Sequence, residues 1–88
     1  MEKHLKHLGF KVRDKVTGFV GICESVSFDL YGCVQAVVRP EVDKKKATEV
    51  PEGRWFDEKR LVAISKKPVM EIPDFEVVPG PCEKPYRL

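Results

Sequence analysis

Two histidines and two cysteines are the side chains of this sequence best suited to binding a metal ion. His4 and His7 lie close together near the start of the chain, and Cys23 and Cys33 follow further on. Structural zinc sites usually take their ligands as close pairs separated by two to four residues, and only the histidines meet that spacing. We therefore interpret the histidines as part of a solvated helical turn, and we expect neither a metal site nor a cofactor.

The rest of the sequence lacks the patterns of a catalytic site. It has no glycine-rich loop to hold a phosphate, no nucleophile elbow and no carboxylate pair with an evident role. A turn and a bulge account for Gly18 and Gly21. A small barrel also leaves little interior for a substrate, since about eight strands are needed to enclose even a small ligand. We predict that the protein is not an enzyme.

The stretch SVSFDLYGCVQAVVRP, residues 25–40, places three large apolar side chains around an aspartate and before a glycine. These are Phe28, Leu30 and Tyr31. A turn that only reversed the chain would favour small polar residues. The apolar turn therefore indicates a contact surface, and we expect Asp29 to hold the turn by accepting backbone hydrogen bonds.

Trp55 and Phe56 are adjacent, so in a strand one faces inward and the other outward. If Phe56 belongs to the core, Trp55 is a surface anchor near Arg60. The alternative is that Trp55 packs under the C-terminal arm or the apolar turn. We expect the turn and the Trp55 strand to form one patch, covered by the arm or by a partner. The predicted partner-binding residues are Phe28, Leu30, Tyr31, Trp55 and Arg60.

The charge balance argues against a protein that is held mainly by phosphates. Sixteen basic and fourteen acidic residues leave a formal net charge of +2, far from the strongly basic balance of such proteins. A nucleic-acid-binding barrel is therefore an alternative that we do not favour. A second alternative is an oligomer that sequesters a small, nucleotide-like anion through Arg13, Arg39 and Arg60. We favour a protein partner over both.

Short apolar alternations predict an all-β fold. Strands are expected at residues 10–16, 20–28, 33–39, 54–56 and 61–64, with an exposed loop at 41–53 and a 3₁₀ turn at 58–60 that Asp57 caps. Glu24 interrupts the second strand, so that either Glu24 reaches solvent or a bulge shifts the register. The expected inward residues are Phe10, Val12, Val16, Val20, Ile22, Val26, Phe28, Val34, Ala36 and Val38. This pattern predicts a small, strongly bent antiparallel barrel of the SH3-like kind with about five strands.

The final residues contain five of the seven prolines together with many apolar side chains. Proline prevents a regular central strand, so we expect an extended Pro-rich C-terminal arm. The predicted organisation is a barrel at residues 1–66 and an arm at residues 67–88. The arm either folds over its own barrel or lies on a neighbouring subunit, which would make a homo-oligomer.

The sequence predicts a cytoplasmic protein that does not enter a membrane. The N-terminus carries charges where a signal peptide would be apolar, and no run reaches the ~20 apolar residues of a membrane span. Three cysteines are an odd number, so free thiols are expected in a reducing cytosol. A bridge between Cys23 and Cys33 is the less favoured alternative.

The sequence resembles a family of short proteins encoded by bacteriophages and prophages. The resemblance lies in a Val-Thr-Gly-x-x-Gly turn at residues 16–21, an aromatic Leu-Tyr-Gly turn at 28–32, and a Trp-Phe-Asp then Arg-Leu ending at 55–61. It brings no catalytic or ligand residues. It implies a phage-associated protein, located in the bacterial host cell or in the virion, that acts as a virion accessory or as an inhibitor of host defence.

Overall fold

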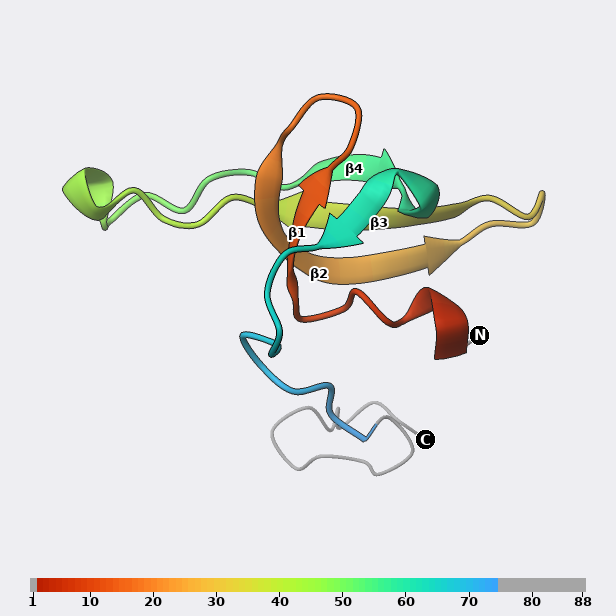
Figure 1. Ribbon diagram of the computed structural model, residues 1–88. Helices are drawn as coiled ribbons and strands as arrows, with labels where there is room; N and C mark the ends of the chain where they lie inside the picture. Colours follow the sequence, from red (N-terminus) through yellow and green to blue (C-terminus); the bar gives the residue numbers. More distant parts are fainter. Residues whose placement is uncertain (1, 75–88) are drawn as a thin grey trace, which may run out of the picture.

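The computed structural model describes residues 2–74, which form one all-β fold (Figure 1). Its sheet has five antiparallel strands in the order β4-β3-β2-β1-β5. The strands are β1 (Lys11–Asp14), β2 (Val20–Phe28), β3 (Val34–Arg39), β4 (Arg54–Asp57) and β5 (Leu61–Ala63). Three 3₁₀ turns accompany them, η1 (Glu2–His4), η2 (Lys44–Lys46) and η3 (Glu58–Arg60). The predicted small bent barrel, with a 3₁₀ turn just before the last strand, is confirmed.

The long strand β2 bends because it contains a bulge. Its first residues pair with β1, and its later residues pair with β3 alone. The register shifts between Cys23 and Ser25, so Glu24 is the extra residue. Of the two interpretations of Glu24, the bulge is therefore correct, and the bend lets one strand serve both halves of the sheet.

The bulge also changes which side chains face the core. The buried apolar residues are Val12, Cys23, Ala36, Val38 and Leu61. Leu8, Phe10, Phe19, Val26 and Phe56 pack against them. The prediction of Val20 and Ile22 as inward residues was wrong, because Gly21 and Cys23 are buried instead. An inserted residue reverses the alternation, so the parity that holds at Val26 does not hold before Glu24.

The prediction of Val16 as an inward residue was also wrong. The first strand ends at Asp14, and Val16 lies in the following turn with 72% of its surface exposed. The inward position after Val12 is taken by Asp14, which is fully buried. A polar residue therefore closes this end of the apolar face.

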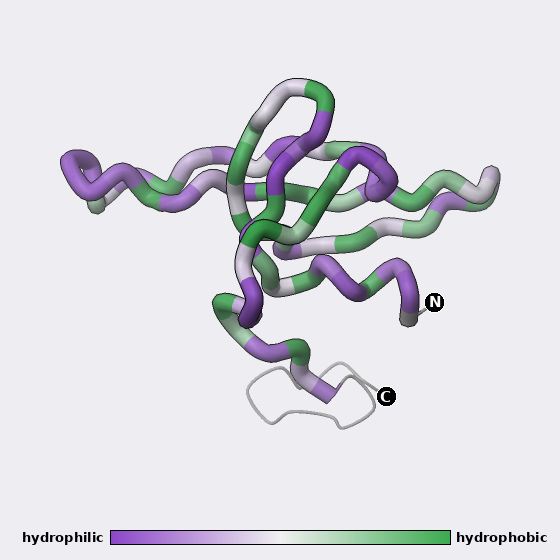
Figure 2. Tube along the Cα trace, viewed as in Figure 1, coloured by the Kyte–Doolittle hydropathy of each residue, from purple (hydrophilic) through white to green (hydrophobic). Residues whose placement is uncertain are grey.

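Two long excursions leave the barrel on opposite sides (Figure 1). One is the β2–β3 hairpin, whose turn contains the apolar side chains singled out above. The other is the connection from β3 to β4, which includes η2. Figure 2 shows that the tip of the second excursion is hydrophilic, in keeping with the lysines of η2.

The described part of the C-terminal arm lies against its own barrel. The backbone N–H of Val69 donates to the carbonyl oxygen of Gly9 at 2.7 Å. Gly9 has a φ of 87°, which favours glycine, and an added Cβ would lie 2.6 Å from the carbonyl oxygen of Met70. Residues 67–74 thus pack in cis, and the remainder of the predicted arm lies outside the described residues.

Candidate interaction surfaces

The turn of the β2–β3 hairpin is held by Asp29. Its Oδ1 atom accepts hydrogen bonds from the backbone N–H groups of Tyr31 at 2.9 Å and Cys33 at 3.0 Å. The carbonyl oxygen of Asp29 also accepts from the N–H of Gly32 at 3.2 Å. The predicted structural role of Asp29 is confirmed, and this local network leaves the intervening side chains free to project.

The side chains at the tip are strongly exposed. Leu30 and Tyr31 keep 90% and 88% of their surface accessible. Phe28, at the end of β2, is partly covered, and its ring meets the ring of His4 edge to face with centroids 5.8 Å apart. Exposed apolar side chains on a well-defined turn form a contact surface rather than part of the core.

Trp55 lies on the outer face of the sheet, at the centre of a row across three strands. Val37 is opposite Trp55 on β3, and Ser25 is opposite Val37 on β2. Trp55 is 58% exposed, whereas its neighbour Phe56 packs against the core. The prediction that Phe56 faces inward and Trp55 outward is confirmed.

The tip and Trp55 belong to separate surfaces, contrary to the single patch expected from the sequence. Tyr31 borders a hollow of about 230 Å³ that it shares with η3 and with Asp57, and Trp55 does not line that hollow. The strand register explains the separation, because Gln35 is opposite Asp57 and the tip extends beyond that pair. The chain therefore offers two apolar sites.

Arg60, predicted both as a partner anchor and as an anion contact, is bound within the fold. Its Nε and Nη2 atoms donate to the two carboxylate oxygens of Asp14 at 2.8 and 2.6 Å. Its guanidinium carbon also lies 5.3 Å from the centre of the Phe56 ring. Hydrogen bonding to the carboxylate raises the pKa of Arg60. Only 37% of the side chain is exposed, so its main contact is structural.

Arg39 is similarly occupied by a neighbour. Its Nε and Nη2 atoms donate to the carboxylate of Glu24, at 2.9 and 2.7 Å to Oε1, and Nη1 donates to the carbonyl oxygen of Pro51 at 2.6 Å. These bonds hold the pKa of Glu24 below its usual value. Arg13, on β1, is exposed and has no side-chain partner among residues 2–74. Of the three arginines predicted to bind an anion, Arg13 alone keeps its donors available.

A buried carboxylate lies between the two histidines. Glu58 Oε1 is 3.5 Å from His4 Nδ1, and Glu58 Oε2 is 3.5 Å from His7 Nδ1. Both separations exceed a normal hydrogen bond, and His7 Nδ1 has no hydrogen-bond partner in the described chain. Burial lowers the pKa of His7 despite the nearby carboxylate. The cluster ties the N-terminal turn to η3.

The thiols and the candidate metal ligands do not form a site in the described residues. Cys23 is buried, Cys33 is exposed, and both are free, so the alternative of a bridge between them is not realised. Burial raises the pKa of Cys23 to about 11, which leaves it protonated and unreactive. Within residues 2–74, no set of three or more His, Cys, Asp or Glu side chains is arranged to hold a metal ion. No helix in that part of the chain has the length and apolar character needed to cross a membrane.

Sequence reasoning missed two buried carboxylates, Asp14 and Glu58. A signal was present for Asp14, since an aspartate followed by Thr17 and Gly18 is typical of a side-chain-stabilised turn. For Glu58 no such signal existed. Its burial follows from the packing of the N-terminal histidines against η3, which no local pattern encodes.

Comparisons with protein-family models, with curated proteins and with solved structures each found no match to this chain.

Proposed function

We propose that the protein is a non-enzymatic binding module that acts through protein–protein contacts. The observation that carries the proposal is the exposure of large apolar side chains at two well-ordered sites, Leu30 and Tyr31 on the hairpin tip and Trp55 on the sheet. Aromatic side chains of this kind dominate the binding energy of protein interfaces. Their positions are fixed by strand pairing and by Asp29, so little conformational entropy is lost on binding.

The surroundings of Trp55 support an interface. The row across the outer face consists of Ser25, Val37 and Trp55, and the next row begins with Ser27 and Gln35. None of these side chains is charged, although 34% of the residues in the chain are. Interface centres are depleted in charge and enriched in aromatic residues, and this face has both features.

The experiment is affinity capture with the tagged full chain from phage-infected or lysogenic cells. We expect Trp55→Ala combined with Tyr31→Ala to abolish capture of the partner, and each single substitution to weaken it. The loss of two interface aromatics corresponds to an affinity reduced by roughly thirtyfold or more. The thermal melting curve should stay nearly unchanged, because both side chains are exposed.

The matched control is Val50→Ala, which truncates another exposed apolar side chain on the loop before β4. This variant should capture the partner as well as the original chain does. If the double variant retains full capture, or if it fails to fold, Tyr31 and Trp55 are not contact anchors and the proposal is rejected.

The resemblance to phage-encoded proteins extends the proposal to the class of partner. A protein of that origin would bind a component of host defence or another virion subunit. The two partners differ in when they are captured. A defence component is present before infection, whereas a virion subunit is captured only after late phage expression.

A further inference from the structure

The distal half of β2 is an unpaired sheet edge. Residues 25–28 pair with β3 on one side, and no strand lies on the other side within residues 2–74. In the same part of the chain, the only further contact to their backbone is a weak one, from the Cys23 thiol to the carbonyl oxygen of Ser25 at 3.9 Å. Unpaired backbone groups on an ordered strand are a template for pairing with another strand.

This edge also lacks the features that usually prevent such pairing. Its sequence is Ser-Val-Ser-Phe, without a charge and without proline. The edge strand β4, in contrast, has a charged residue at each end, Arg54 and Asp57, and β5 is only three residues long. The distal half of β2 is therefore the most accessible of the sheet edges in the described chain.

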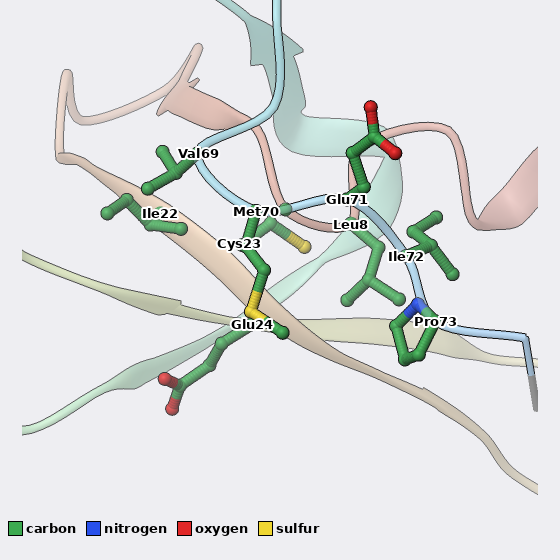
Figure 3. Close-up of a pocket in the computed structure, with 10 residues that line it drawn as sticks. Leu8, Ile22, Cys23, Glu24, Val69, Met70, Glu71, Ile72 and Pro73 are labelled. Atoms are coloured by element: carbon green, nitrogen blue, oxygen red, sulfur yellow. The ribbon is translucent and has the colours of Figure 1, made fainter. Parts of the chain in front are cut away.

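An apolar pocket lies beyond one end of this edge. It has a volume of about 330 Å³ and is lined by Leu8, Ile22, Val69, Met70 and Ile72, among others. Figure 3 shows the arm running along one side of the pocket, with Ile22, Cys23 and Glu24 of β2 on the other. Met70 is 72% exposed even though it packs beside the barrel, so the arm leaves this pocket unfilled.

The exposed tip lies beyond the opposite end of the same edge. Leu30 and Tyr31 follow β2 directly, and the pocket adjoins the residues just before position 25. A two-fold axis through the edge exchanges its two ends. Two copies paired antiparallel would therefore bring the tip of each toward the pocket of the other, in a self-complementary arrangement.

We propose that the protein forms a homodimer in which the distal halves of β2 pair antiparallel across a two-fold axis, with each hairpin tip entering the apolar pocket of the other copy. Pairing around Ser27 places Val26 opposite Phe28 of the second copy on the inward face. Such pairs of β-branched and aromatic residues stabilise antiparallel strands. Ser27 lies opposite Ser27 of the second copy, so the register brings no like charges together between residues 26 and 28.

The exposed area is sufficient for this interface. The whole chain, terminal residues included, exposes 7216 Å², whereas a compact monomer of 10.1 kDa exposes about 5,300 Å². A standard interface buries about 800 Å² on each partner. A second copy can therefore cover the edge, the tip and the pocket without requiring the outer face that carries Trp55.

The first test is the mass of the full chain in solution, measured by light scattering or sedimentation. We expect twice the 10.1 kDa of one chain at tens of micromolar. Ser27→Lys should give the monomer mass, because it places two ammonium groups against each other at the axis. The matched control is Gln35→Lys, which adds the same charge one strand away from the edge, opposite Ser27, and should leave the dimer intact.

A second test does not depend on how well Ser27→Lys folds. With Cys33 and Cys82 replaced by serine, Ser27→Cys should cross-link into a covalent dimer on mild oxidation, and Gln35→Cys should not. A monomeric original chain, a Ser27→Lys variant that is still dimeric, or the absence of a Ser27→Cys cross-link each overturns the proposal. Trp55→Ala should keep the dimer while losing partner capture, so this inference and the proposed function fail separately.

Discussion

Asp14 is the polar residue that the fold depends on most directly. Its carboxylate accepts hydrogen bonds from Arg60 and from the backbone and hydroxyl groups of Thr17, and it is fully buried. The Asp14 carboxylate therefore joins the β1–β2 turn to η3. Hydrogen bonds from Arg60 hold the pKa of Asp14 well below its usual range, because the fold binds the charged form.

The acid stability of the protein should report this carboxylate. A carboxyl group whose pKa is lower in the folded state stabilises the fold fully above its unfolded pKa, near 3.8 for Asp14, and this stabilisation is lost as the pH falls. We expect Asp14→Asn to lower the melting temperature by at least several degrees at pH 7. The difference from the original chain should shrink as the pH is lowered through 4 to 3.

The control for this experiment is Glu41→Gln. Glu41 forms an ion pair with Lys11 at 2.9 Å, but both side chains are largely open to solvent. Exposed ion pairs contribute little to stability, so this variant should melt like the original chain at both pH values. A difference between Asp14→Asn and the original chain that does not change with pH would contradict the assignment of Asp14 as the ionised partner of Arg60.

At the scale of elements, the arm is fastened to the barrel at Gly9. The carbonyl oxygen of Gly9 accepts from Val69, and the absence of a side chain at Gly9 lets the backbone of Met70 approach. This contact brings the arm beside β2 and creates one wall of the apolar pocket. The arm therefore acts as part of the surface that we assign to the second copy.

Two glycines with similar backbone angles separate this contact from backbone strain. Gly9 and Gly18 have φ of 87° and 81°, but only at Gly9 would an added Cβ meet another atom closely, 2.6 Å from the Met70 oxygen. Both alanine variants should lose about 1–2 kcal/mol because L-residues resist positive φ. Gly9→Ala should lose more, and it should also release the arm.

Trypsin cleavage after Lys66 and Lys67 measures that release. We expect faster cleavage at these two sites in Gly9→Ala than in Gly18→Ala or in the original chain. Equal cleavage rates in the two variants would show that the arm does not depend on the close approach at Gly9.

At the scale of the whole molecule, the distribution of charge matters more than its sum. The net charge is +2, and two of the candidate arginines are held by Asp14 and Glu24. The lysines of η2 sit at the tip of an exposed loop, away from the aromatic residues. Lysines without neighbouring aromatic side chains form a solvated surface rather than a nucleic-acid site.

Binding to duplex DNA should therefore be weak. At 0.15 M salt we expect a Kd weaker than about 10 µM, within the range of non-specific binding. Replacing all three lysines of η2 by glutamine should change it little more than the loss of three surface charges predicts. Fluorescence anisotropy at two salt concentrations measures this, and tight binding with a steep salt dependence would favour the nucleic-acid alternative over a protein partner.

Local chemistry determined much of this fold. The alternation in the residues of β3, the cap that Asp57 provides for η3 and the turn held by Asp29 each depend on side chains close in sequence. The inward position of Phe56 and the outward position of Trp55 follow from strand geometry in the same way. These features could be predicted because their causes lie within a few residues.

Only the tertiary structure decided where Val20, Ile22 and Arg60 lie, and that the tip and Trp55 form two surfaces. A bulge reverses every side chain on one side of it, and its exact position depends on pairing with β3. The partner of Arg60 is Asp14, 46 positions away in the sequence. Such contacts depend on how distant strands meet, and the energies that fix them exist only once the sheet has closed.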